Sequence, residues 1–265
     1  MSADAAVRIR TEGPPHILGE EGRLALRRLA RGQGLLAFDF DGTLAPIARR
    51  PESVRIRPRT RELLAAAARL YPCAVISGRG LADLRRVLDG LDLAALAGSH
   101  GAESSWTSAL PVQVRVGDWA VSLRSRLRGQ AGVVVERKPF GVALHYREAT
   151  DRAAARAAIL RLVADIPSVR VMAGKQVVEI VAAGAPTKAH ALAEIRRRVQ
   201  AETALYAGDD VTDEDAFREG DRDHLVSVRV GAGRASAAAF MLPSQRDMDA
   251  LLAELIALRA RGTRR

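Results

Sequence analysis

Two acidic pairs, far apart in the chain, have the residue types needed to bind a metal ion and attack a phosphate ester. Asp39 and Asp41 follow a short apolar run, and Asp209 and Asp210 follow another. Clustered carboxylates repel one another unless a cation holds them, and Mg²⁺ prefers oxygen ligands. Such a cation would also polarise a phosphoryl group. The two pairs therefore predict a Mg²⁺-dependent phosphohydrolase site, provided that the fold brings them together.

Within the first pair, the two carboxylates predict different roles. A carboxylate can attack phosphorus and form an aspartyl-phosphate, which divides one difficult displacement into two steps. We assign this role to Asp39, and we expect Asp41 to protonate the departing oxygen and then to activate the attacking water. An isolated Asp-x-Asp is more often a turn or a helix cap. The preceding apolar run, the following Gly42-Thr43 and the second acidic pair favour the catalytic interpretation.

The elements that must position these residues alternate between short apolar strands and helices. This pattern predicts a doubly wound, Rossmann-like parallel sheet of the α/β class. In such sheets ligands bind at the carboxyl ends of the strands. Four predicted strands end in polar residues or glycine and should share one edge. These endings are Asp39, Ser77, His100 and Gly208.

The alternation is interrupted between the two acidic pairs. Residues 109–185 have the pattern of a helix, two strands, a second helix and two more strands, which predicts an inserted α+β cap domain. We expect residues 34–108 and 186–265 to form the core domain, and residues 1–33 to form an N-terminal tail with a short helix. Residues 1–19 contain Gly and Pro with little periodicity and are expected to be loose.

Composition excludes several classes of protein. Of the 265 residues, 48% are apolar and 27% are charged, as in ordinary globular proteins. Cys73 is the single cysteine, so an internal disulfide is impossible and a cytoplasmic location is expected. No apolar stretch is long enough for a membrane span, so we expect no membrane partner. The net charge of +10 comes from arginines dispersed along the chain, and aromatic residues make up only 4%. Both observations argue against a nucleic-acid partner. The positive charge nevertheless suits an anionic substrate.

Lysine is rare in this arginine-rich chain. Only Lys138, Lys175 and Lys188 occur among 41 basic residues. A lysine acts as a compact point charge, whereas an arginine presents a planar fork. Each of the three lies beside a suspected site motif, so all three are candidate site residues.

The run Asp39-Phe40-Asp41-Gly42-Thr43-Leu44 resembles the first signature of the haloacid dehalogenase superfamily. Ser77, in Val75-Ile76-Ser77-Gly78-Arg79, matches the second signature. Lys188 matches the third, and Gly208-Asp209-Asp210 matches the fourth.

This resemblance implies a role for each matching residue. Asp39 is the nucleophile, Asp41 the acid/base, and Thr43 and Ser77 support the phosphate. Lys188 neutralises both the phosphate and the nucleophile. The implied Mg²⁺ ligands are Asp39, Asp41 (also through its backbone carbonyl) and Asp209, with Asp210 and Asp213 behind them.

A narrower resemblance is to the trehalose-6-phosphate phosphatases. Residues 208–217 (GDDVTDEDAF) are similar to that family's hallmark, as are residues 98–103 and several cap residues. The resemblance implies hydrolysis of trehalose 6-phosphate to trehalose and phosphate in trehalose biosynthesis, with functional coupling to a trehalose-6-phosphate synthase as a further expectation. Recognition of a disaccharide needs carboxylates and cations in a cap that excludes water on closure. The residues expected to contact the substrate are Asp39, Asp41, Gly42, Thr43, Ser77, Gly78, Arg79, His100, Glu103, Glu136, Lys138, Lys175 and Glu179.

The residues also leave alternatives open. The third signature reads Thr187-Lys188-Ala189 where the family usually has Asn-Lys-Gly, so the placement of Lys188 is in question. His100 could instead order its loop through a hydrogen bond. The substrate could be sucrose 6-phosphate or a glycosyl-phosphoglycerate, and a phosphomannomutase-type reaction is a further alternative. Outside catalysis, the chain could be a sugar-phosphate sensor.

Overall fold

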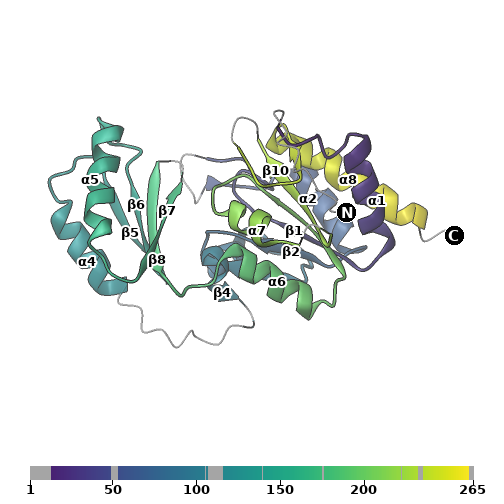
Figure 1. The fold of residues 1–265 in the computed structure, drawn as a ribbon, viewed down its shortest axis with the longest axis horizontal. Coiled ribbons are helices and arrows are strands. Elements are labelled where there is room, and N and C mark those ends of the chain that lie inside the picture. Colours follow the sequence, from purple (N-terminus) through teal and green to yellow (C-terminus); the bar gives the residue numbers. More distant parts are fainter. Residues whose placement is uncertain are drawn as a thin grey trace, which may run out of the picture.

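The computed structural model describes residues 13–48, 53–104, 106, 116–138, 140–174, 176–221, 223–231 and 235–262. It has two lobes, which lie side by side in Figure 1. The larger lobe contains a seven-stranded sheet, and the smaller lobe contains a four-stranded sheet formed by the inserted segment. The α/β class with a parallel core and an α+β insertion is therefore confirmed.

The large sheet is parallel except at one edge. Its strand order is β11-β10-β9-β1-β2-β3-β4, and only the short β4 runs antiparallel to its neighbour. In this order β1 and β9 are adjacent, which brings the residues that follow them to the same edge. The strands are β1 (Gly34–Phe38), β2 (Cys73–Ile76), β3 (Ala95–Gly98), β4 (Glu103–Ser104), β9 (Thr203–Gly208), β10 (Leu225–Val230) and β11 (Phe240–Leu242).

Helices cover both faces of this sheet. Alternate residues of β1 point to opposite faces, so that Leu36 and Phe38 join one core cluster while Leu35 and Ala37 join the other. The first cluster includes residues of α1 (Glu20–Arg31), α2 (Pro58–Ala68), α3 (Leu81–Val87) and α8 (Met248–Gly262). The second includes residues of α6 (Lys188–Arg198) and α7 (Asp213–Glu219). Figure 1 shows α1 and α8 on one side and α6 and α7 on the other.

The segment just before α1 is not loose, so that part of the expectation was wrong. Ile17 is fully buried in the first core cluster. Its backbone N–H donates to the carbonyl of Met241 at 3.0 Å, which ties the segment to β11. The pair Ile17-Leu18 between polar and Gly/Pro residues is too short to show a period, so the sequence pattern could not predict this contact. Residues 1–12 lie outside the described residues.

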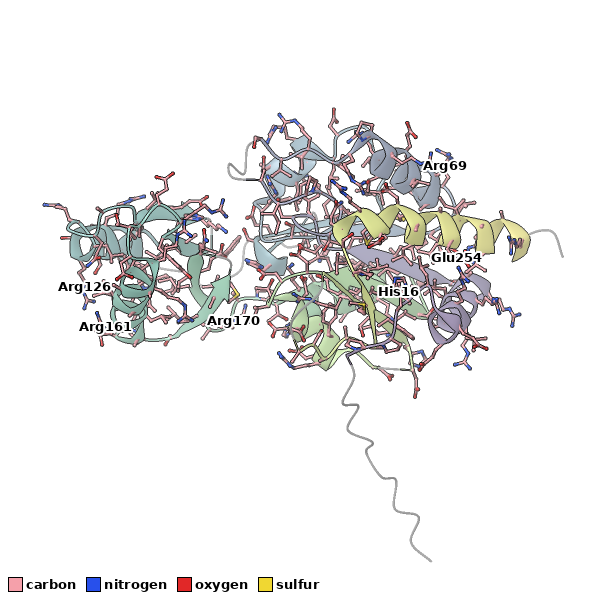
Figure 2. The ribbon with its side chains drawn as sticks, turned by 90° about the horizontal axis from the view of Figure 1, so that it is seen from above. His16, Arg69, Arg126, Arg161, Arg170 and Glu254 are labelled. Carbon is pink, nitrogen blue, oxygen red and sulfur yellow. The ribbon has the colours of Figure 1, made fainter. Side chains whose placement is uncertain are left out.

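The small lobe is an antiparallel sheet with helices on one face. Its strand order is β5-β6-β8-β7, and α4 and α5 pack on β6 and β8 through a separate apolar cluster. Arg126 of α4 and Arg161 of α5 lie away from the large lobe, whereas Arg170 of β7 lies near the junction (Figure 2). The elements are α4 (Val116–Arg126), β5 (Val134–Lys138), β6 (Gly141–His145), α5 (Arg152–Ala164), β7 (Val169–Gly174) and β8 (Val177–Ala182).

The domain boundaries at residues 34, 109 and 186 stay a proposal. Arg170 donates to the carbonyl of Pro186 at 3.4 Å, which links the small lobe to the returning chain.

Among the described residues, none of the helices combines the length and the apolar content that a membrane-spanning segment requires.

Candidate active site

The carboxyl ends of the central strands meet at one cleft between the two lobes. Asp39 follows β1, Ser77 follows β2, His100 follows β3, and Asp209 follows β9. All four line a cavity of about 470 Å³ that side chains of the small lobe also line. The sequence argument that these strand ends share one edge is thus correct for all four strands.

Lys188 lies at the centre of the buried part of the cleft. Its ammonium donates to Oδ1 of Asp39 at 2.8 Å and to Oδ1 of Asp213 at 2.7 Å. The three side chains are almost fully buried. Thr187 caps the N-terminus of α6 by accepting from the backbone N–H of His190, so the Thr-Lys-Ala sequence still places the lysine beside Asp39.

Burial and charge act in opposite directions at this centre. Burial raises the pKa of Asp39, Lys188 opposes that rise, and the charges of Asp213 and Asp209 add to it, leaving the pKa well above its usual range. Burial alone would lower the pKa of the Lys188 ammonium, but Asp213 and Asp39 more than offset it and hold that pKa above its usual value. These two carboxylates therefore favour the charged form of Lys188.

The carboxylates around Lys188 fit a divalent cation. Asp39, Asp209 and Asp213 each offer an oxygen, and these oxygens lie within 4.8 Å of one another. One ammonium cannot neutralise three buried carboxylates, and an all-oxygen donor set suits Mg²⁺. Oδ1 of Asp210 is also buried and, among the described residues, accepts no hydrogen bond. The cluster can therefore hold a metal ion.

Two residues of the first signature support Asp209. The backbone of Gly42 has φ +90°, and a Cβ there would collide with the Asp209 carboxylate. Thr43 is fully buried and donates to Oδ1 of Asp209 at 3.4 Å. Neither residue lines the cleft, so the structure places both behind the acidic cluster.

Asp41 is held by Arg79 in a bidentate ion pair. Nε donates to Oδ2 at 2.6 Å and Nη2 donates to Oδ1 at 2.7 Å. Nη1 donates to Asp83 at 2.5 Å, and the guanidinium also lies over the ring of Phe40. Asp83 was not among the predicted residues; it lies four residues after Arg79, in the first turn of α3.

Three residues join the two lobes across the cleft. Glu179 of β8 accepts from Lys138 of β5 and contacts Nε2 of His100, in the large lobe, at 2.9 Å. Lys138 also donates to the carbonyl of Gly78 at 3.5 Å. Burial raises the pKa of Glu179, but Lys138 and His100 outweigh it and keep that pKa below its usual range. The imidazole of His100 therefore bonds to a residue of the other lobe, whereas the alternative from the sequence was a hydrogen bond that orders its own loop.

Glycine makes this contact across the lobes sterically possible. A Cβ at Gly78 would overlap the imidazole of His100. His100 itself has φ +57° in the left-handed region, where a non-glycine residue is strained. Its backbone N–H donates to the carbonyl of Ser77 at 2.9 Å, which fixes the turn. The strained backbone of His100 and its close packing against Gly78 therefore both lie at the cleft.

Comparison with known proteins agrees with this geometry. The sequence profile of the family described as trehalose-phosphatase matches residues 37–245. The chain belongs to the trehalose-phosphatase family. The matched segment includes every residue discussed above from Asp39 to Asp213.

Individual members and neighbours show how far the similarity extends. The trehalose-phosphate phosphatase of Mycobacterium tuberculosis is 35% identical over 246 residues, covering 83% of this chain and 62% of that protein. Another M. tuberculosis protein, named as an uncharacterized glycosyl hydrolase, is 40% identical over 211 residues, covering 72% of this chain and 16% of that protein. The chain therefore spans less than two thirds of the length of these relatives. The solved C-terminal domain of Candida albicans trehalose-6-phosphate phosphatase has the same fold, with a TM-score of 0.78 at 21% identity over 93% of this chain and 99% of that one.

One predicted substrate contact of this trehalose-phosphatase family member, Glu103, does not line the cleft. Glu103 accepts from Ser99 and from the backbone N–H of Leu81 at 3.3 Å, so it holds the start of α3 and does not line the cavity. Asp213, expected behind the metal ligands, accepts from Lys188 and also does not line the cavity. Lys175 lies outside the described residues.

Other residues of the cleft were not assigned a site role from the sequence. Glu136, which was predicted, lines the cavity and is hydrogen-bonded at 2.8 Å to His145, which was not. This bond, opposed by burial, lowers the pKa of Glu136. The directly opposed strands β5 and β6 bring the pair together, and strand alternation could have suggested it. The further lining residues that were not predicted include Ile47, Arg137, Arg147 and Thr212.

Proposed function

We propose that the chain hydrolyses trehalose 6-phosphate to trehalose and inorganic phosphate through a phosphorylated Asp39. The observation that carries this proposal is the buried contact of Lys188 with Asp39 at 2.8 Å, beside the carboxylates of Asp209 after β9 and of Asp213 at the start of α7. Membership of the trehalose-phosphatase family supports the substrate. A bound Mg²⁺, for which Asp39, Asp209 and the backbone carbonyl of Asp41 are the proposed ligands, would offset the charge of the phosphate and polarise it.

The first step is attack on phosphorus by the free carboxylate oxygen of Asp39. A new O–P bond forms, the bond between phosphorus and the sugar oxygen breaks, and Asp41 gives its proton to that oxygen. Lys188 balances the charge of the nucleophile and of the phosphoryl group, with Ser77 proposed to hold the phosphoryl oxygens. Both oxygens of Asp41 accept from Arg79, so at least one of these hydrogen bonds must open and the carboxylate must take up a proton from solvent before Asp41 can protonate the sugar oxygen.

The second step releases phosphate. Water attacks the phosphorus of the aspartyl-phosphate and gives its proton to Asp41, the O–P bond to Asp39 breaks, and inorganic phosphate leaves. Each group then has its starting charge and proton. The reaction therefore needs no redox partner, and its products are trehalose and phosphate.

Sugar recognition is assigned to the small lobe. Glu136 and Lys138 of β5 and Glu179 of β8 lie on the two strands that flank β6, and all three line the cleft. Carboxylates and an ammonium at this spacing suit the paired hydroxyls of a disaccharide. We also propose functional coupling to a synthase of trehalose 6-phosphate in the cytoplasm, since such an enzyme must supply the substrate.

Phosphate release from a panel of sugar phosphates tests this function. With Mg²⁺ present, kcat/KM for trehalose 6-phosphate is expected to exceed that for glucose 6-phosphate and sucrose 6-phosphate by about 100-fold or more, because only the disaccharide with the correct linkage meets the polar groups of the small lobe. Chelation with EDTA should abolish release, and added Mg²⁺ should restore it. Equal rates on trehalose 6-phosphate and glucose 6-phosphate would contradict the substrate, and transfer of phosphate to a second hydroxyl would indicate a mutase.

Glu179→Gln tests the role of the small lobe. The amide keeps the shape but loses the charge that Lys138 and His100 face, and hydrogen bonds to charged groups contribute about 1.5–3 kcal/mol. KM for trehalose 6-phosphate is therefore expected to rise about tenfold or more, with kcat changed by less than about threefold. Asp165→Asn, on the exposed outer surface of the same lobe, is the matched control and should change neither constant. An unchanged KM in Glu179→Gln would remove this residue from sugar binding.

A further inference from the structure

A buried tyrosine lies directly behind the reacting groups. Tyr206 belongs to β9, is fully buried, and packs its ring against Phe217 of α7 with centroids 5.8 Å apart. Its hydroxyl donates to Oδ1 of Asp213 at 2.6 Å. The two-step reaction above gives this phenol no role, and a phenylalanine would fill the same space. A polar group in such a position therefore calls for an explanation.

The phenol completes a set of hydrogen bonds that fixes Asp213. Oδ1 of Asp213 accepts from both Tyr206 and Lys188, while Oδ2 accepts from the backbone N–H of Asp210 at 2.8 Å. A Cβ at Gly208 would collide with this carboxylate, so the backbone of β9 also confines it. Because three donors bond to its two oxygens, the carboxylate of Asp213 is held in one orientation. Loss of the phenol would free one of these directions.

The contacts continue from Asp213 to the nucleophile. Lys188 bridges Oδ1 of Asp213 at 2.7 Å and Oδ1 of Asp39 at 2.8 Å. All of these side chains are shielded from solvent. Water therefore cannot replace a lost hydrogen bond here, as it can for a side chain on the surface. The phenol adds a donor without adding charge to a site that already holds three carboxylates. Burial, followed by the charges of Asp213 and Asp39, raises the pKa of Tyr206, which keeps the proton on the phenol.

We propose that Tyr206 is a positioning residue for phosphoryl transfer, which acts through Asp213 to hold Lys188 against Asp39. This inference rests on the proposed phosphatase reaction. Without the phenol, Asp213 can rotate, and Lys188 then no longer keeps one fixed position between the nucleophile and the incoming phosphoryl group. Such a loss affects the transition state more than the binding of the sugar, which the small lobe performs.

Tyr206→Phe tests this proposal, with Tyr71→Phe as the matched control. Tyr71 is also buried, and its hydroxyl donates to the carbonyl of Leu255 at 2.9 Å on the α8 side of the large lobe. Both variants keep the ring and lose one buried hydrogen bond. In Tyr206→Phe, kcat is expected to fall about 10- to 100-fold while KM changes less than about twofold. In Tyr71→Phe, both constants should stay at the wild-type values.

Two further readouts separate positioning from a loss of stability. The inhibition constant of orthovanadate, a mimic of the phosphoryl transition state, should rise in Tyr206→Phe by about the same factor as kcat falls, whereas that of inorganic phosphate should rise less. The unfolding temperatures of the two variants should fall by similar amounts. Wild-type kcat and vanadate inhibition in Tyr206→Phe, or equal losses in both variants, would overturn the proposal. A wild-type protein that releases no phosphate from any ester would instead overturn the reaction, and this inference with it.

Discussion

Asp39→Asn is expected to lower kcat for trehalose 6-phosphate by roughly four orders of magnitude or more, with the fold intact. An amide oxygen is a poor nucleophile, and removal of a covalent nucleophile leaves only the catalysis due to binding and charge stabilisation. The amide still accepts a hydrogen bond from Lys188 and no longer repels Asp209 and Asp213. The free energy of unfolding should therefore change by no more than about 1–2 kcal/mol.

Phosphate release and thermal unfolding are measured together for this variant. Asp92→Asn is the matched control, because Asp92 is exposed and precedes β3, at the amino end of the parallel sheet and so opposite the cleft. That control should keep wild-type kcat and stability. If Asp39→Asn kept more than about one hundredth of wild-type kcat, Asp39 could not be the nucleophile.

Lys188→Met is expected to damage both stability and catalysis. The substitution removes the only cation that contacts both Asp39 and Asp213 in the described site, and it leaves two buried carboxylates without their counter-charge. Breaking a buried ion pair from one side costs about 3–5 kcal/mol. We expect the free energy of unfolding to fall by about that amount, and kcat at a temperature where the variant is folded to fall at least about 1,000-fold.

A second substitution separates the two effects of Lys188. Lys188→Met combined with Asp213→Asn removes both charges of one pair, and it should recover part of the lost stability without recovering kcat. Arg197→Met, which removes an exposed cation from the same helix, should leave both properties close to wild type. Wild-type stability and kcat in Lys188→Met would show that the ammonium carries neither function.

The sequence predicted the parts of the site that depend on local pattern. Apolar runs followed by Asp39, Ser77 and Asp209 identified strands and their carboxyl ends, because parallel strands must share that edge. The two short strands β4 and β11 were missed, because two or three residues are too few to show a period. The inserted lobe was visible because the spacing of its strands and helices differs from that of the core.

Contacts that join distant segments could not be predicted in the same way. Lys188 meets Asp39 across 149 positions, and His100 meets Glu179 across 79. The pairing of Arg79 with Asp41 depends on how two loops at the sheet edge lie relative to each other, and periodicity does not determine that. The role of the Tyr206 hydroxyl could not be predicted for another reason. A tyrosine in an apolar strand has the same sequence pattern as any core aromatic residue, and only the structure shows its hydrogen-bond partner.

Trapping of the phosphoenzyme tests the role of Asp39 as the covalent nucleophile. Turnover of trehalose 6-phosphate with Mg²⁺ is quenched in acid, the acyl phosphate is reduced with borohydride, and the peptides are identified by mass spectrometry. Reduction converts an aspartyl-phosphate to homoserine. We expect homoserine at position 39, dependent on both the substrate and Mg²⁺, and none in Asp39→Asn. Homoserine at the position of Asp41, Asp209 or Asp213, with Asp39 unmodified, would contradict this account.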